Sequence, residues 1–194
     1  MMYINFFKRF IDIFISLLIL PIIFIIGFII FIFIKIEDQG TLFYKSLRLG
    51  KNGRTFKMIK FRSMKENAAV KKNLDGSTFV GENDSRLTKV GSFLRKTSLD
   101  ELPQIWNVFI GDMSFIGPRP DLPGALEDYT ENDKKKLDVK PGITGYNQAY
   151  FRNSVSQKEK FKHDCFYVEN ISFLLDIKIF FRTIMSVLSR KNIY

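Results

Sequence analysis

The sequence contains little cysteine and little histidine, and it lacks the loop that holds phosphates in many nucleotide-binding proteins. Because Cys165 is the only cysteine, the chain cannot form an internal disulfide, and no second thiol supports a metal site. This composition suits a reducing compartment. His163 is the only histidine, which argues against a histidine-based triad or metal cluster, so we expect both residues to be structural. The glycines at Gly50 and Gly81 lack the Gly-Lys-Ser or Gly-Lys-Thr ending of a P-loop.

The composition is both basic and apolar. The 194 residues fit one ordinary domain with an appendage, and they have a formal net charge of +10 with 21 phenylalanines and 46% apolar residues. Such a chain is expected to meet an acidic surface, and both anionic lipid and nucleic acid qualify.

A long apolar run occupies residues 10–34 and has the length of a transmembrane helix. A cleaved signal peptide is disfavoured, because Lys35-Ile-Glu-Asp-Gln39 follows the run instead of a small-residue cleavage site. Lys8 and Arg9 precede the run and a larger excess of basic residues follows it, so both ends are expected on the cytoplasmic side. Pro21 removes a backbone hydrogen bond and bends a helix. These features fit two arrangements equally well: a helix that enters the membrane, breaks at Pro21 and returns to the same face, and a simple kinked span.

The middle of the chain begins with a predicted β-hairpin. Short mixed runs within residues 42–64 flank an Asn-Gly dipeptide, which is typical of tight turns between strands. Lys57, Lys60 and Arg62 alternate with apolar neighbours, and we expect their side chains to lie on one face. The polar residues 65–90 are predicted to form a mobile loop.

Two adjacent carboxylates stand between basic residues in the stretch 93–120. Asp100 and Glu101 follow Arg95-Lys96 and precede Arg119, which lies between two prolines. A carboxylate is ionised at neutral pH, so it can attack an electrophilic phosphorus without a general base. Nearby arginines would bind the phosphate oxygens and neutralise their charge. The pattern therefore indicates phosphate chemistry.

A structural explanation of the same acids is also open. Ser98 and Glu101 have the spacing of a helix capping box, and acids in a first helical turn are stabilised by the helix dipole. Pro103 favours a different frame, because proline prefers the first helical position and would leave both acids just ahead of the helix. In that frame residues 102–110 form an amphipathic helix, with apolar side chains as core or membrane contacts and Asn107 as a satisfied polar group.

The rest of the chain is predicted to be mainly helical. Residues 121–139 have the charge pattern of a solvated helix and loop, and residues 141–145 have the glycines of a turn. Apolar residues outnumber charged ones over residues 161–188, which is typical of a helix lying on a membrane interface; a core helix is the alternative. The predicted fold class is α+β, mainly helical, with an N-terminal membrane helix-break-helix, a small β-hairpin and interfacial amphipathic helices around the active site.

Several short motifs occur together in one order along the chain. They are Lys60-Phe-Arg-Ser-Met64, Arg86-Leu-Thr88, Gly91-Ser-Phe-Leu-Arg95, Thr97-Ser-Leu-Asp-Glu-Leu-Pro-Gln104, Asn107-Val108, Gly111-Asp-Met-Ser114, Gly117-Pro-Arg-Pro120 and Lys140-Pro-Gly-Ile-Thr-Gly145. With these motifs the chain resembles the bacterial sugar transferases, and specifically the small monotopic phosphoglycosyl transferases of the inner membrane. The motifs cover most of the chain, and their joint occurrence is far more specific than any one of them.

The resemblance implies a reaction and roles for these residues. A UDP-sugar would donate its sugar 1-phosphate to undecaprenyl phosphate, a polyprenyl phosphate, and UMP would be released. Asp100 would attack the sugar-proximal phosphorus and form a covalent intermediate, and Glu101 would manage a proton or support the metal. Mg²⁺ would be the cofactor, bridging Asp100 and the diphosphate oxygens. The phosphate-binding residues would be Arg95, Arg119, Lys60 and Arg62.

The resemblance also implies a place in the cell. Residues 1–38 would form a membrane-embedded re-entrant hairpin, and residues 39–194 a cytoplasmic catalytic domain on the surface of the bacterial inner membrane. Two positions depart from the family pattern. A serine often precedes the proline of the membrane helix, where this chain has Leu20, and a tryptophan often stands near the position of Tyr146. The second departure leaves the transferred sugar open.

Two further functions fit parts of this pattern. A hexose-1-phosphate transferase related to the larger, multi-span members of the family would differ only in its sugar. A non-catalytic membrane-anchored adaptor or nucleic-acid binder would fit the net charge and the aromatic residues interleaved with basic ones, but it would not explain the acids in the strongest motif. We therefore expect no nucleic-acid partner. The sequence leaves the oligomeric state open.

Overall fold

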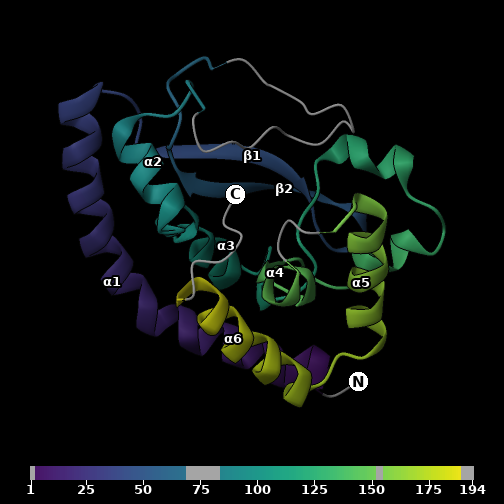
Figure 1. The fold of residues 1–194 in the computed structure, drawn as a ribbon. Helices are drawn as coiled ribbons and strands as arrows, with labels where there is room; N and C mark the ends of the chain where they lie inside the picture. Colours follow the sequence, from purple (N-terminus) through teal and green to yellow (C-terminus); the bar gives the residue numbers. More distant parts are fainter. Residues whose placement is uncertain (1–2, 69–83, 152–154, 189–194) are drawn as a thin grey trace.

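The computed structural model describes residues 3–68, 84–151 and 155–188, which form helices around two small sheets (Figure 1). The α+β, mainly helical class is confirmed, and so is the β-hairpin. Most of the loop predicted over residues 65–90 lies outside the described ranges. The elements in chain order are η1 (Tyr3–Phe7), α1 (Lys8–Glu37), β1 (Phe43–Leu49), η2 (Lys51–Gly53), β2 (Thr55–Phe61), α2 (Lys89–Lys96), η3 (Leu99–Glu101), α3 (Gln104–Ile110), β3 (Ser114–Ile116), η4 (Pro123–Asp128), η5 (Asp133–Asp138), β4 (Gly142–Thr144), α4 (Tyr146–Tyr150), α5 (Gln157–Glu169) and α6 (Phe173–Leu188).

The helix α1 has 30 residues, most of them apolar, and by length and composition it could cross a membrane. Many of its apolar side chains are exposed, as Phe24 and Phe28 illustrate, so the rest of the protein covers only part of the helix. The helix continues through Pro21 and changes direction in the middle of its course (Figure 1). Instead of the expected break the chain has a continuous, bent helix, because helical backbone angles can persist around one missing hydrogen bond. The re-entrant course stays a prediction.

Polar side chains fasten the first half of α1 to the remainder of the chain. Arg9 donates hydrogen bonds to the carbonyl oxygens of Val108 (2.6 Å) and Phe109 (2.7 Å) in the last turn of α3. Asp12 is buried and accepts bonds from the Ser114 hydroxyl and the Phe115 backbone N–H, each 3.1 Å long. A buried carboxylate needs such donors because it has lost its hydration. These bonds hold α3 and β3 against the apolar helix.

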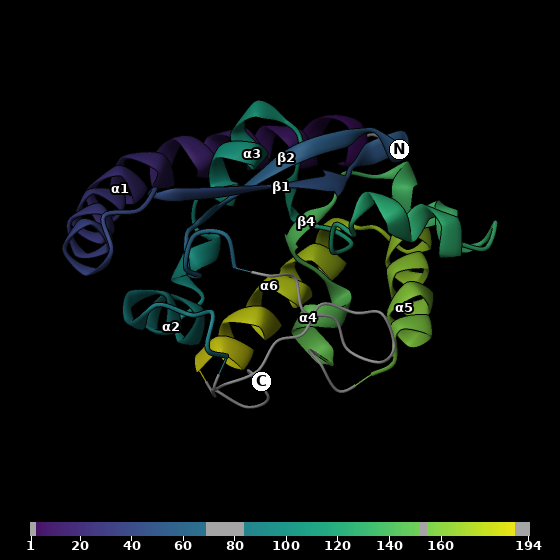
Figure 2. The same cartoon turned by 90° about the horizontal axis from the view of Figure 1, so that it is seen from above.

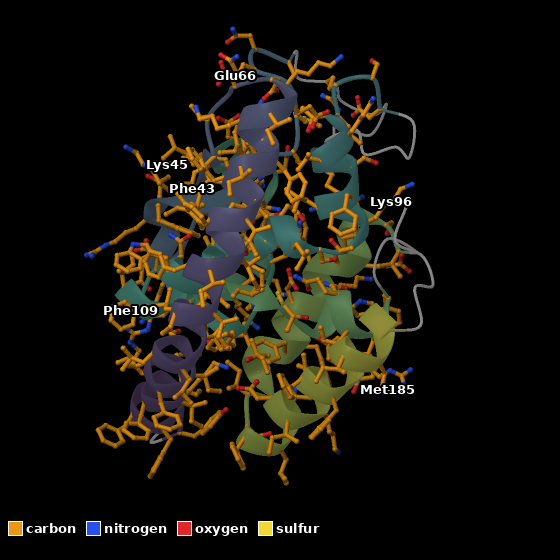
Figure 3. All side chains as sticks on the ribbon, turned by 90° about the vertical axis from the view of Figure 1, so that its left-hand side faces the viewer. Phe43, Lys45, Glu66, Lys96, Phe109 and Met185 are labelled. Carbon is orange, nitrogen blue, oxygen red and sulfur yellow. The ribbon has the colours of Figure 1, made fainter. Side chains whose placement is uncertain are left out.

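The second half of α1 packs against α2 and the hairpin (Figures 1 and 2). Four buried side chains form the core of this contact: Ile30, Ile34, Phe61 and Leu94. The helices α4, α5 and α6 gather to one side of it (Figure 2). In Figure 3, which looks onto α1, Phe43 and Phe109 lie on one side of the helix and Met185 lies on the other. Exposed apolar side chains therefore flank α1 on both sides.

The strands β1 and β2 form the antiparallel hairpin that the Asn-Gly dipeptide predicts. The register places Lys60 opposite Tyr44 and Arg48 opposite Phe56. Opposite side chains share a face, and side chains alternate between the faces along each strand. Lys60 and Arg48 therefore share one face, whereas Lys57 lies on the other. The expectation that Lys57 and Lys60 share a face is wrong, because they are three positions apart and only even spacings return to the same face of a strand.

The strands β3 and β4 pair in parallel, where we expected only a turn at residues 141–145. The glycines of this segment permit a close approach between backbones. A Cβ at Gly142 would lie 2.1 Å from the Gly117 nitrogen, and one at Gly145 would lie 2.1 Å from the Gly117 oxygen. The sequence pattern missed this pairing because parallel strands join segments that are far apart along the chain.

The predicted helix over residues 161–188 consists of two helices, α5 and α6. Ser156 and Glu159 form a capping box at the start of α5. Near the start of α6, the buried Asp176 pairs with Lys8 of α1. The helix α6 also has exposed large apolar side chains, as the interfacial interpretation predicts: Phe173, Leu174, Phe180, Phe181, Ile184 and Met185.

Residues 121–139 contain two short 3-10 helices, η4 and η5, where we expected a solvated helix and loop. Lys136 is only 5% exposed, so that expectation is wrong for this residue. Its Nζ lies 2.7 Å from a carboxylate oxygen of Asp121 and 2.7 Å from one of Asp164. Lys136 is buried because it is paired with two acids from other segments, and paired, hydrogen-bonded charges can be buried.

Candidate active site

The two adjacent carboxylates stand in the 3-10 turn η3 between α2 and α3. Asp100 and Glu101 precede α3, whose N-cap is Pro103. Ser98 has a left-handed backbone with φ 57°, and its side chain makes no capping hydrogen bond. The capping-box interpretation is therefore wrong. Both acids lie ahead of the helix, as the frame that Pro103 favours predicts, but α3 begins at Gln104 with Pro103 as its N-cap instead of its first residue.

Glu101 is held by two cations. Its Oε1 atom lies 2.5 Å from Lys60 Nζ and 3.5 Å from Arg119 Nη2. Burial opposes ionisation of Glu101, but the charges of Lys60 and Arg119 outweigh burial and lower its pKa to about 2. Glu101 is therefore ionised and paired at neutral pH.

Asp100 has a different environment although it is the next residue. It is 7% exposed, and Lys60 Nζ lies 4.0 Å from its Oδ2 atom. Within the described ranges its carboxylate accepts no hydrogen bond. Burial raises the pKa of Asp100, and the charge of Lys60 offsets this only in part. The oxygens of Asp100 therefore stay available to another partner.

The predicted arginines Arg95 and Arg119 approach the acids from two sides. Arg95 lies in the last turn of α2, and its Nε donates to the Ser63 hydroxyl at 3.0 Å. The close packing of α2 depends on Gly91, where a Cβ would lie 1.9 Å from the Ser63 carbonyl oxygen. The charges of both arginines lower the pKa of Asp100, although less than burial raises it.

Arg62, the remaining predicted phosphate-binding residue, makes its contacts elsewhere. Its guanidinium pairs with both oxygens of Asp38, just after the end of α1, and its Nε donates to the Thr41 carbonyl oxygen at 2.7 Å. The hydrogen bonds to Asp38 raise the pKa of Arg62. The structure does not bring Arg62 to the carboxylate pair. It uses this residue to join the end of the apolar helix to the segment after β2.

Asn107 fastens α3 to the hairpin. Its Oδ1 accepts a 3.0 Å bond from the Ile59 backbone N–H, and its Nδ2 donates a 2.9 Å bond to the Lys57 carbonyl oxygen. The residue is 1% exposed, so the expected satisfied polar group is confirmed. Because α3 begins shortly after Glu101, these bonds also fix the position of the acid pair relative to the hairpin.

Sequence analysis missed Arg48, which lines a small pocket beside Glu101. Arg48 is half-buried, and burial together with the charge of Arg119 lowers its pKa. A signal was available in the hairpin, because a register closed at the Asn-Gly turn puts Arg48 and Lys60 on one face. The pocket is lined by Arg48, Met58, Glu101, Gln104, Arg119, Pro120 and Gly142.

Sequence analysis also missed the Lys136 cluster, which consists of Lys136, Asp121, Asp164 and Tyr129. The Tyr129 hydroxyl donates to Asp121 at 2.5 Å, beside the two ion pairs of Lys136. Asp121 follows Arg119 by two residues, so the cluster fixes the loop that presents Arg119. The local charge pattern does not distinguish Lys136 from its two lysine neighbours.

His163 and Cys165 lie on α5 and make contacts of a structural kind. The His163 Nδ1 atom lies 2.8 Å from Asn147 Oδ1, and its ring stacks on Phe151. The Cys165 thiol donates to the Asn132 carbonyl oxygen at 3.2 Å. Within the part of the chain that the structure describes, no three His, Cys, Asp or Glu side chains gather as a metal site.

The structure thus combines an apolar helix of membrane-spanning length with a buried carboxylate among basic side chains. The chain belongs to the bacterial sugar transferase family, which matches residues 3–190. It is 42% identical over 160 residues to the uncharacterized sugar transferase EpsL of Bacillus subtilis, covering 82% of this chain and 76% of that protein.

Two further relatives have names that state a reaction. The chain is 42% identical over 177 residues to the UDP-galactose-lipid carrier transferase of Erwinia amylovora, covering 86% of this chain and 37% of that protein. It is 40% identical over 202 residues to the undecaprenyl-phosphate galactose phosphotransferase of Salmonella typhimurium, covering 98% of this chain and 42% of that protein. The chain thus spans less than half of each of these two relatives.

Proposed function

We propose that this protein is a phosphoglycosyl transferase that moves a sugar 1-phosphate from a UDP-sugar to undecaprenyl phosphate and releases UMP. The names of the Erwinia and Salmonella relatives support the reaction class. The observation that supports it most directly is Asp100, a buried carboxylate with no hydrogen bond from the described residues and with basic side chains nearby. Such a group is placed to meet a phosphorus atom rather than to hold the fold.

The proposed mechanism has two displacements at one phosphorus. A carboxylate oxygen of Asp100 forms a bond to the phosphorus that bears the sugar. The bond from this phosphorus to the bridging oxygen breaks, and its electron pair leaves with UMP. An oxygen of undecaprenyl phosphate then attacks the same phosphorus, and Asp100 leaves as a free carboxylate. Splitting the exchange in this way lets one small site serve both substrates in turn.

The basic residues and Glu101 have different roles in this scheme. Lys60, Arg95 and Arg119 stabilise the negative charge on the phosphate oxygens during each displacement. Glu101 is ionised and paired with Lys60 and Arg119, so its low pKa suits it to holding these cations in place better than to moving a proton.

The donor atoms at the site fit Mg²⁺. This ion is commonly held by one or two carboxylates together with substrate phosphates, so a cluster of three protein ligands is not required. Asp100 has free oxygens for such a role, whereas Glu101 is already paired with Lys60. Bound Mg²⁺ would neutralise charge on the diphosphate.

A membrane location follows from the insoluble acceptor. Undecaprenyl phosphate must present its phosphate at the membrane surface, and α1 and α6 both expose large apolar side chains. We place residues 1–38 in the bacterial inner membrane as a re-entrant element and residues 39–194 on its cytoplasmic face. The non-catalytic adaptor is not favoured, because the relatives are named as transferases.

The test is UMP release from a panel of UDP-sugars by the detergent-solubilised protein with Mg²⁺ and undecaprenyl phosphate. UDP-galactose belongs in the panel because two relatives are named for galactose. We expect release with at least one donor and loss of release on chelation. Absence of release from every donor, with the protein shown to be folded, would contradict the proposal.

A further inference from the structure

Arg48 is a half-buried arginine without an acidic partner. Within the described ranges it forms no ion pair, and its side chain donates only to the Ser46 hydroxyl at 3.3 Å and to the Pro120 carbonyl oxygen at 3.5 Å. The charge of Arg119 acts on it unfavourably, as does its own burial. A guanidinium has five donors in a planar fork, so most of its hydrogen-bonding capacity remains unused here. An anion bound between Arg48 and Arg119 would use these free donors and offset the repulsion between the two charges.

The hairpin aims Arg48 at the site. Arg48 and Lys60 share one face of the β1–β2 pair, and Met58 lies between them on that face. Lys60 contacts Glu101 at one end of this row. At the other end Arg48 meets the Pro120 carbonyl, next to Arg119. The row therefore runs from the acid pair to the two arginines.

The pocket lies along this row. Arg48, Glu101 and Arg119 all line it, together with the apolar side chain of Met58. Arg119 is 55% exposed at its side chain, so its guanidinium can still turn toward a ligand. Glu101 is the acid of this pocket, and it is already paired with Lys60 and Arg119. Within the described ranges Arg48 therefore has no ion pair of its own, and the charges of Asp121 and Glu101 act on it favourably at longer range.

We propose that Arg48 and Arg119 together bind the nucleotide-side phosphate of the UDP-sugar and keep hold of it as UMP leaves. This inference rests on the proposed function, and it assigns a residue and a position to the leaving group. When the bond between the sugar-bearing phosphorus and the bridging oxygen breaks, the electron pair stays on that oxygen and the UMP phosphate gains one negative charge. Paired guanidinium groups stabilise this charge through bidentate hydrogen bonds.

The experiment measures equilibrium binding of UMP and of uridine to the full chain in detergent. The variants are Arg48→Gln, Arg48→Lys and the control Arg54→Gln, which removes an exposed arginine from the same hairpin. We expect Arg48→Gln to weaken UMP binding by about tenfold or more, as loss of a charge-assisted hydrogen bond does, and to leave uridine binding unchanged. Arg48→Lys should bind UMP with intermediate affinity, and Arg54→Gln should match the wild type.

Three results would overturn the inference. One is UMP affinity in folded Arg48→Gln equal to that of Arg54→Gln. Another is an equal loss of UMP and uridine affinity, which would indicate a general distortion of the pocket. Thermal unfolding of each variant establishes folding, and Arg48→Lys serves in the comparison with Arg54→Gln if the glutamine variant does not fold. The third is a folded wild type that does not bind UMP. Turnover separates the two proposals. If the wild type releases UMP and Arg48→Gln binds UMP as tightly as the wild type, only the role of Arg48 is contradicted. If the folded wild type releases no UMP from any donor, the proposed function is contradicted.

Discussion

Two groups of buried charges flank Arg119, and they differ in how completely their members are paired. In the Lys136 cluster, Asp121 and Asp164 each lie 2.7 Å from Lys136. Asn147 also donates to Asp164 at 2.9 Å. In the group around Asp100, that carboxylate accepts no hydrogen bond from the described residues. The first group is closed, and the second is open.

The difference separates structure from chemistry. A closed group satisfies its own hydrogen bonds and charges, so its free energy is lowest without any ligand. An open group keeps buried charges that are incompletely paired, which destabilises the fold unless a substrate supplies the missing contacts. Burial alone therefore does not identify the active site. Incomplete pairing is what distinguishes Asp100 and Arg48 from the Lys136 cluster.

The largest effect should come from Asp100→Asn. We expect UMP release to fall by roughly a thousandfold or more, because the amide is no nucleophile for the proposed step. The protein should still fold and remain in membranes, since Asp100 accepts no hydrogen bond from the described residues. Asp128→Asn, at an exposed acid, is the matched control. Turnover of Asp100→Asn near the wild-type rate would end the covalent mechanism.

In the closed group, Lys136→Met should act on stability first. It leaves Asp121 and Asp164 close together without their cation, and breaking a buried pair in this way costs about 3 to 5 kcal/mol of unfolding free energy. Denaturant unfolding of the full chain in detergent measures the loss. Lys135→Met removes the neighbouring surface lysine and should leave the unfolding midpoint almost unchanged. Equal midpoints for the two variants would show that the cluster is not the buried structural unit described above.

Substitution of Arg62 tests whether this predicted phosphate-binding residue belongs to a closed group of charges, as Lys136 does. Arg62→Gln and Asp38→Asn should each lower stability, and the double variant should lose less than the sum, with a coupling of about 1 to 3 kcal/mol. UMP affinity should stay the same in all three variants. If Arg62→Gln weakens UMP binding while Asp38→Asn does not, Arg62 contacts phosphate in addition to its ion pair with Asp38.

The smallest effect should come from an acid paired at the surface. Glu37, near the end of α1, accepts hydrogen bonds from the backbone N–H groups of Lys89 (2.6 Å) and Val90 (2.9 Å) at the start of α2. Glu37→Gln keeps the shape and removes the charge, so stability should fall by only about 0.5 kcal/mol. Thr88→Ala removes the N-cap hydroxyl of α2 and should cost about 1 kcal/mol by the same unfolding measurement. A loss of unfolding free energy from Glu37→Gln as large as that from Lys136→Met would contradict the expectation that buried charge pairs contribute more to stability than exposed ones.

Most of the local elements of the fold could be predicted from the sequence. The apolar run gave the long helix, the Asn-Gly dipeptide gave the hairpin, and Pro103 gave the position of Asp100 and Glu101 ahead of α3. Each of these features depends on backbone preferences or side-chain periodicity within a few residues. The candidate acids and two arginines could be named for the same reason, because they stand together along the chain.

The partners of the basic residues could not be predicted in this way. Arg62 has the same local pattern as Lys60, yet it pairs with Asp38, and Lys136 looks like a surface lysine but is buried. Arg48 lies about seventy positions before Arg119 and comes close to it only when the hairpin packs beside the Pro120 loop. The parallel pairing of β3 with β4 was missed for the same reason.

The sequence by itself determined most of the local helices and turns, and its resemblance to a family pointed to the candidate acids. The tertiary structure alone decided which cations face those acids, which are consumed by structural ion pairs and which remain open. The physical reason is that a charge interacts with whatever lies within a few ångströms, whereas the sequence orders residues along the chain. Only folding turns distance along the chain into distance in space.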